Sequence, residues 1–111
     1  ELGAHWLGPL AENLDMWIDK VFARRIKETL SMKPSNYLAR NVRVTPHNTV
    51  EPVPQFFERY PHLATCYCYS TDYPHLEGGA HINRKAQDIL APLGEAVLES
   101  YFVSNGEWLL P

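Results

Sequence analysis

Apolar side chains recur at helical spacing through the first part of the chain. Gly8-Pro9 places a proline where the first turn of a helix tolerates one. The apolar positions that follow share one face of a helix: Leu10, Leu14, Trp17, Val21 and Leu30, with Ile18, Phe22 and Ile26 widening the stripe. This pattern predicts one long helix from about Pro9 to Leu30. Pro34 then opens a short helical turn that we expect over Ser35 to Arg40.

Two short runs have the composition of β-strands. The β-branched run Asn41 to Thr45 is stopped by Pro46, and the run Thr65 to Ser70 alternates cysteine and tyrosine. Further helical segments are predicted in Glu51 to Tyr60 after its prolines, over Asn83 to Leu90 and over Glu95 to Phe102. Strands that alternate with helices are typical of a parallel sheet, yet two strands are too few for a stable one. We therefore predict an α/β fold in which residues 1–111 form one segment of a larger domain.

Composition and charge change this picture little. The 111 residues suffice for one modest core, and 45% hydrophobic with 21% charged residues is ordinary for a globular domain. The net charge of -3 gives no reason to expect nucleic acid or an anionic membrane as a partner. The basic cluster Arg24-Arg25-Ile26-Lys27 follows acidic residues on the same predicted helix. The helix dipole favours that order, and a binding patch is the alternative interpretation.

Nothing in the chain predicts a membrane anchor or a secretion signal. No apolar run approaches the ~20 residues that span a bilayer and no signal-peptide pattern is present, so we expect a cytoplasmic protein. Cys66 and Cys68 agree with a reducing compartment, because in a strand their Cα atoms lie roughly 6.5–7 Å apart, at or beyond disulfide reach. The first residue is Glu1 rather than methionine, which suggests a fragment or a processed product.

Asp72 is the strongest candidate for a chemical role. It follows the second predicted strand directly, and in parallel α/β proteins the carboxyl ends of the strands carry the active site. A plain turn-forming role is the alternative, since Asp before Tyr73-Pro74 suits a turn. His75 lies in the same loop and His47 follows the first predicted strand. Both strand ends would meet at one edge, so His47 and His75 become candidates together.

A zinc site is a second possibility. His62, Cys66, Cys68 and His75 supply the four nitrogen or sulfur ligands that a structural zinc needs. The C-x-C spacing within an apolar run favours buried thiols instead. The chain contains no G-x-S-x-G elbow, no phosphate-binding or dinucleotide-binding glycine motif, no H-E-x-x-H and no H-x-H pair.

The stretch Ser70-Thr71-Asp72-Tyr73-Pro74-His75 and the order of segments resemble the amidohydrolase 2 family. That family includes aminocarboxymuconate-semialdehyde decarboxylase and related metal-dependent hydrolases. The resemblance covers the whole chain: residues 1–7 resemble the end of the sixth barrel strand, 41–46 the seventh strand, 65–72 the eighth and 103–110 the closing helix.

The resemblance implies strands six to eight of a (β/α)8 barrel, incomplete in this chain. Asp72 would be a ligand of a divalent metal, with Zn²⁺ expected, or would hold the metal-bound water. Glu1 would stand where decarboxylases of the family carry an acid/base histidine, and His47 and His75 would orient a small carboxylated, amide or ester substrate. The H-x-H ligands would lie before residue 1, so the segment would be inactive without an N-terminal barrel partner.

The alternative function is of another class. The chain could be a non-catalytic structural or interaction module, derived from such a barrel, that covers its exposed surfaces by self-association. A homo-oligomer would replace the N-terminal barrel segment as the partner. The missing H-x-H pair leaves open whether the chain is an enzyme or such a module.

Overall fold

The computed structural model describes residues 2–110, without the side chain of Glu77. Its α-helices are α1 (Leu7–Ile18), α2 (Arg24–Thr29), α3 (Pro34–Asn41), α4 (Val53–Arg59), α5 (Ile82–Leu90), α6 (Glu95–Glu99) and α7 (Asn105–Glu107). Short 3-10 helices occupy Val21–Ala23, Pro61–Cys66, Leu76–Gly78 and Ala91–Leu93, and Ser100–Ser104 forms a π-helical turn. Within residues 2–110, no helix combines the length and the apolar character needed to cross a lipid bilayer.

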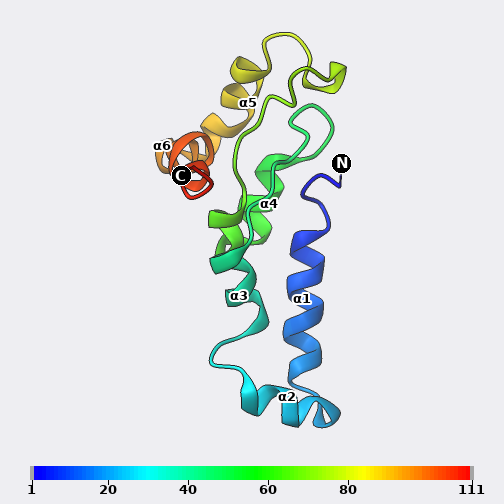
Figure 1. Ribbon diagram of the computed structural model, residues 1–111. Coiled ribbons are helices and arrows are strands. Elements are labelled where there is room, and N and C mark those ends of the chain that lie inside the picture. The colour runs from blue at the N-terminus through cyan, green and yellow to red at the C-terminus, as the bar shows by residue number, and fades with distance from the viewer. Residues whose placement is uncertain (1, 111) are drawn as a thin grey trace.

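The helices form an elongated body with principal extents of 50 × 30 × 25 Å (Figure 1). α1 and α3 pack against each other and α2 joins them at one end of the molecule. α4 lies in the middle, and α5 and α6 occupy the opposite end from α2. α2 and the turns on either side of it therefore project away from the core.

The predicted α/β fold is wrong. Across the described residues there is no β-sheet, and the two predicted strands meet only at an isolated parallel bridge between Val44 and Tyr67. The Val44 amide donates to the Cys66 carbonyl at 2.8 Å, and the Cys68 amide donates to the Val44 carbonyl at 3.0 Å. The chain is an all-helical small domain, not strands six to eight of a barrel.

Local structure explains why the predicted strands do not form. Pro61 begins a 3-10 helix that runs to Cys66, so it takes the first two residues of the second predicted strand. α3 continues to Asn41 and takes the first residue of the other. The few extended residues that remain pair once and have no third strand beside them, which is too little for a sheet.

The predicted helix over residues 9–30 is divided into two. α1 ends at Ile18, and Lys20 adopts an extended conformation before the turn that leads into α2. The break reverses the chain and brings the start of α3 beside α1. There the Asp15 carboxylate accepts hydrogen bonds from the amide and the hydroxyl of Ser35, at 2.9 and 2.6 Å.

The core is aromatic and lies between α1, α4 and the segments near the bridge. Its largest fully buried side chains include Tyr67 and Tyr101. Phe56 stacks on Tyr67 with ring centroids 5.3 Å apart, and Phe57 meets both tyrosines edge-on. Gly8 allows α1 to approach closely, because a Cβ there would lie 2.1 Å from the Tyr60 ring.

Candidate functional site

The loops that follow the two extended segments lie side by side. The Asn48 side-chain amide donates to the Ser70 carbonyl at 3.0 Å, and its oxygen accepts from the Tyr101 hydroxyl at 2.5 Å. The bridge between Val44 and Tyr67 holds the segments before these loops in the same direction. The 46–48 and 70–75 loops therefore leave the core at the same end of the paired segments.

Asp72 and His75 form a pair within one turn. Asp72 has a left-handed backbone with φ of 59°, its amide donates to the Ser70 hydroxyl at 3.2 Å, and its carbonyl accepts from the His75 amide at 2.8 Å. The carboxylate lies 3.5 Å from His75 Nδ1, with the two side chains 35% and 52% exposed. A carboxylate beside one imidazole nitrogen can orient the ring for proton transfer at the other.

The other predicted site residues contribute differently. His47 is half-buried, and its backbone amide donates to the Glu51 carboxylate at 2.7 Å. Glu1 lies outside the described residues. Among the predicted site residues that the structure describes, this turn brings Asp72 and His75 together, at the edge of a hollow lined by Thr71, Tyr73, His75, Gly78, Gly79 and Ile82.

The described residues do not fit a metal ion. No three His, Cys, Asp or Glu side chains among them form a group that could hold one. Cys66 and Cys68 are buried free thiols, and burial raises the pKa of Cys66 to about 11. Zinc binds the thiolate, so a raised pKa works against the predicted zinc site.

Glu51 is a carboxylate with a structural role that sequence reasoning missed. It accepts hydrogen bonds from the backbone amides of Ala4 at 2.9 Å, His5 at 2.7 Å and His47 at 2.7 Å. These bonds fasten the segment before α1 to the loop after the bridge. Its hydrogen-bond partners lie up to 47 residues away along the chain, so no local pattern in the sequence predicts them.

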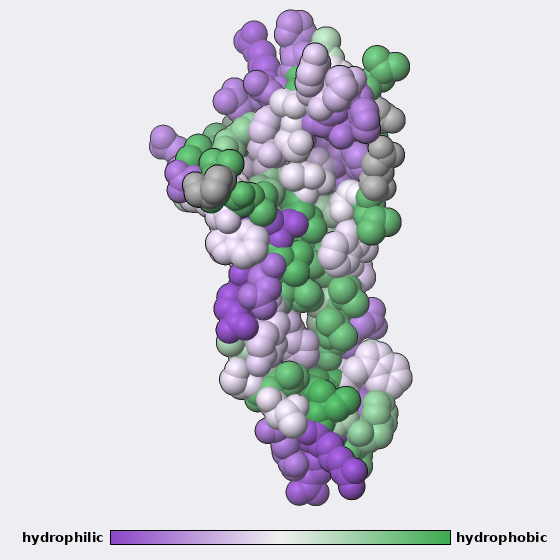
Figure 2. Space-filling model, viewed as in Figure 1, coloured by the Kyte–Doolittle hydropathy of each residue, from purple (hydrophilic) through white to green (hydrophobic). Residues whose placement is uncertain are grey.

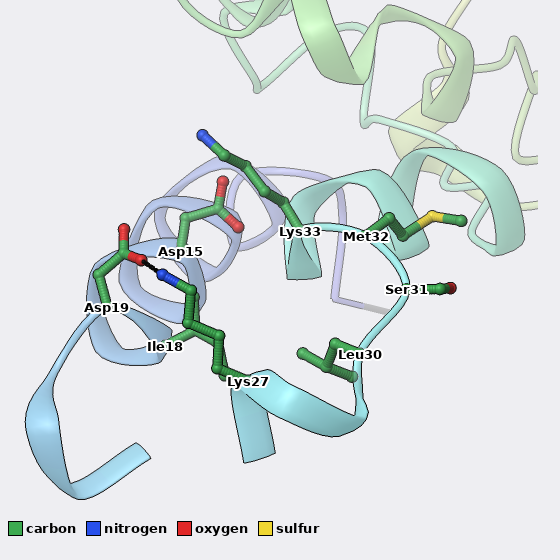
Figure 3. A pocket seen from close by; sticks show the side chains of 8 residues that line it. All are labelled: Asp15, Ile18, Asp19, Lys27, Leu30, Ser31, Met32 and Lys33. Carbon is green, nitrogen blue, oxygen red and sulfur yellow. Dashed lines mark hydrogen bonds and ion pairs between the residues drawn. The ribbon is translucent and has the colours of Figure 1, made fainter. Parts of the chain in front are cut away.

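A cavity of about 200 Å³ lies between the end of α1, α2 and the 30–33 segment (Figure 3). Its lining residues are Asp15, Ile18, Asp19, Lys27, Leu30, Ser31, Met32 and Lys33. The Lys27 ammonium lies 2.6 Å from Asp19 Oδ1, and this contact lowers the pKa of Asp19. The cavity is smaller than the ~300 Å³ at which small-molecule sites begin, and its Asp15 carboxylate already binds Ser35.

A surface of exposed apolar side chains runs along α1. We define the α1 stripe as the exposed apolar side chains along α1 and just beyond it: Trp6, Leu10, Leu14, Trp17 and Val21. α1 buries Leu7, Gly8 and Ala11 instead, so its apolar face is wider than the face that packs. Trp17 is 51% and Val21 is 92% exposed. Figure 2 shows hydrophobic surface over the α1 side of the molecule down towards α2.

The stripe continues onto the turn before α2 and into α2. Phe22 lies with its ring centroid 5.3 Å from that of Trp17, and Phe22 and Ile26 are 72% and 60% exposed. None of these seven side chains belongs to the core or to the half-buried residues packed against it.

Comparison with known proteins found no matching family model, no similar curated protein and no similar solved structure. The resemblance to the amidohydrolase 2 family therefore stays a prediction.

Proposed function

We propose that the chain is a non-catalytic module that self-associates through the α1 stripe. The observation that carries the proposal is the set of large apolar side chains along α1 and α2 that are between 37% and 92% exposed. Monomeric proteins rarely expose one continuous apolar patch of such size unless it is an interaction site.

The size of the surface favours a second copy as the partner. Taken at their exposed fractions, the stripe with Phe22 and Ile26 offers roughly 700 Å² of apolar surface, against about 800 Å² per partner in a specific interface. Within α1 the stripe also has the 4-3 spacing of a helix–helix seam from Leu10 to Trp17. A seam on one helix is self-complementary, as a two-fold dimer requires.

The oligomeric state tests the proposal. In sedimentation equilibrium, we expect the 12.7 kDa chain to form a dimer of about twice that mass. Val21→Glu should shift the population to monomer, since burying an unpaired charge in the interface is costly. Val21 is 92% exposed, so this variant should keep the wild-type circular dichroism spectrum, and its Tm should equal that of the wild type at concentrations where both are monomeric.

Ile89→Glu is the matched control. Ile89 is an exposed apolar residue on α5, away from the stripe, and its replacement should leave the dimer intact. A wild-type protein that stays monomeric at high micromolar concentration would refute the proposed function. So would a Val21→Glu dimer as tight as that of the wild type.

A second candidate function is the hydrolase or decarboxylase that the resemblance implies. The Asp72 carboxylate beside His75, next to the 46–48 loop, favours it. As no metal group forms among the described residues, a divalent metal would need ligands from outside residues 2–110. The test is hydrolysis of a small ester and decarboxylation of a small aromatic acid by the wild type and Asp72→Asn. Loss of turnover in the variant alone would support this function, and equal turnover would contradict it.

A further inference from the structure

We infer that two copies of the chain pair antiparallel, with the α1 stripes crossing at Leu14. The inference rests on the proposed self-association and specifies its geometry. Leu14 lies near the middle of the stripe between Trp6 and Val21, so a two-fold axis there lets each copy cover the whole stripe of the other.

Charge decides between the two orientations. α1 contains Glu12 and Asp15 but no lysine or arginine, whereas residues 20–27 contain four cations and no acid. A parallel pair would place the two cationic segments against each other. An antiparallel pair places each of them against the acidic helix of the other copy, which is the favourable electrostatic arrangement.

Two of the four cations have no partner in an ion pair within residues 2–110 and are available for this contact. Arg24 pairs with Glu28 and Lys27 with Asp19 inside the chain. Lys20 and Arg25 make no salt bridge among residues 2–110, and both are exposed. Each would approach the N-terminal half of α1 in the other copy, where Glu12 is exposed and pairs at 3.6 Å with Arg59 of its own chain.

Side-chain size agrees with the antiparallel order. When the two helices cross at Leu14, the smaller side chain of Leu10 faces the larger side chain of Trp17 in the other copy. In a parallel pair the same positions face themselves, and two indoles would have to fit opposite each other. Large residues opposite smaller ones pack a helix interface more closely.

Cysteine cross-linking tests the orientation. We expect mild oxidation to link Leu14→Cys with itself and a mixture of Leu10→Cys with Trp17→Cys as a heterodimer. Leu10→Cys alone should give no covalent dimer. Wild-type protein is the control, because Cys66 and Cys68 are 0% and 1% exposed and cannot reach another copy.

The outcomes separate the two proposals. A dimer in which Leu10→Cys and Trp17→Cys each link only to themselves would overturn the antiparallel geometry and leave the proposed function standing. A dimer in which none of the three positions cross-links would also overturn it, and would place the interface elsewhere. A monomer under all conditions would refute both. As a second measurement, Arg25→Glu should weaken the dimer at least tenfold, and Glu12→Lys combined with Arg25→Glu should recover part of that loss.

Discussion

The hydroxyl of Tyr67 is buried in the core without a hydrogen-bond partner among the described residues. The ring itself packs well, between Phe56 and Phe57. Burial raises the pKa of the phenol, which keeps it protonated. A buried hydroxyl that has lost its hydrogen bonds to water and gained no partner destabilises the folded state.

We predict that Tyr67→Phe stabilises the fold by about 1 kcal/mol, because it removes the unsatisfied hydroxyl and keeps the ring. The free energy of unfolding in urea is the measurement. Tyr101→Phe is the matched control: its hydroxyl donates to Asn48 at 2.5 Å, so that substitution should destabilise. A Tyr67→Phe variant less stable than the wild type would show that the hydroxyl has a partner in solution.

Individual residues also show which parts of the candidate site could be predicted from the sequence. Asp72 and His75 are three residues apart, and a turn is enough to bring them together, so the loop could be anticipated from sequence. Glu51 could not, because its amide donors at Ala4 and His5 depend on the tertiary fold. The divalent metal at Asp72 stays a prediction, but the sheet edge at which Asp72, His47 and His75 were expected to meet is absent from residues 2–110.

At the scale of elements, α1 supports α3 through one carboxylate. Asp15 accepts from the amide and the hydroxyl of Ser35 in the first turn of α3, a role that the residue before the helix, Lys33, cannot fill with its own side chain. First-turn amides have no partner within a helix and need an outside acceptor.

We predict that Asp15→Ala destabilises the protein by about 1–2 kcal/mol, as loss of a helix cap does. Hydrogen exchange should show the loss first at the amides of Ser35 and Asn36. Asp88→Ala on the exposed face of α5 removes the same charge without a cap and is the control. Equal stabilities for the two variants would contradict the capping role.

Helices were easier to predict than strands. The prediction over Asn83 to Leu90 is confirmed by α5 (Ile82–Leu90), and that over Ser35 to Arg40 lies inside α3. Helical periodicity is a local property of the sequence, so it predicts a helix whichever segments later pack against that helix. A strand needs partners from elsewhere in the chain, and the run Thr65 to Ser70 finds only one bridge.

The break after α1 shows the limit of periodicity. The apolar stripe continues to Ile26, which is why one helix from Pro9 to Leu30 was predicted. α1 ends at Ile18 and the chain reverses, which brings α3 beside α1 and leaves the far part of the stripe exposed. The pattern identified the apolar residues correctly and could not say whether they face the core or another molecule.

For the whole molecule, buried acids that stay protonated govern the response to alkali. Burial raises the pKa of Cys66 from 9.0 to about 11, and it raises the pKa values of Cys68, Tyr67 and Tyr101. The unfolded chain ionises these groups at their ordinary values, 9.0 for the thiols and 10.0 for the phenols. Above pH 9 the unfolded state therefore binds fewer protons than the folded state.

We predict that the free energy of unfolding, with respect to these groups, is constant below pH 9 and falls as the pH rises from 9 towards 11. Each unit by which folding raises a pKa lowers the free energy of unfolding by about 1.4 kcal/mol once the pH exceeds the folded-state pKa. Urea titrations at pH 7, 8, 9 and 10 measure the slope, and Cys66→Ala should reduce it, since that variant lacks one of the four groups. Tyrosinate absorbance should rise in two stages, with Tyr67 and Tyr101 ionising only as the fold is lost. A stability unchanged between pH 8 and 10 would mean that these side chains reach solvent in the native state.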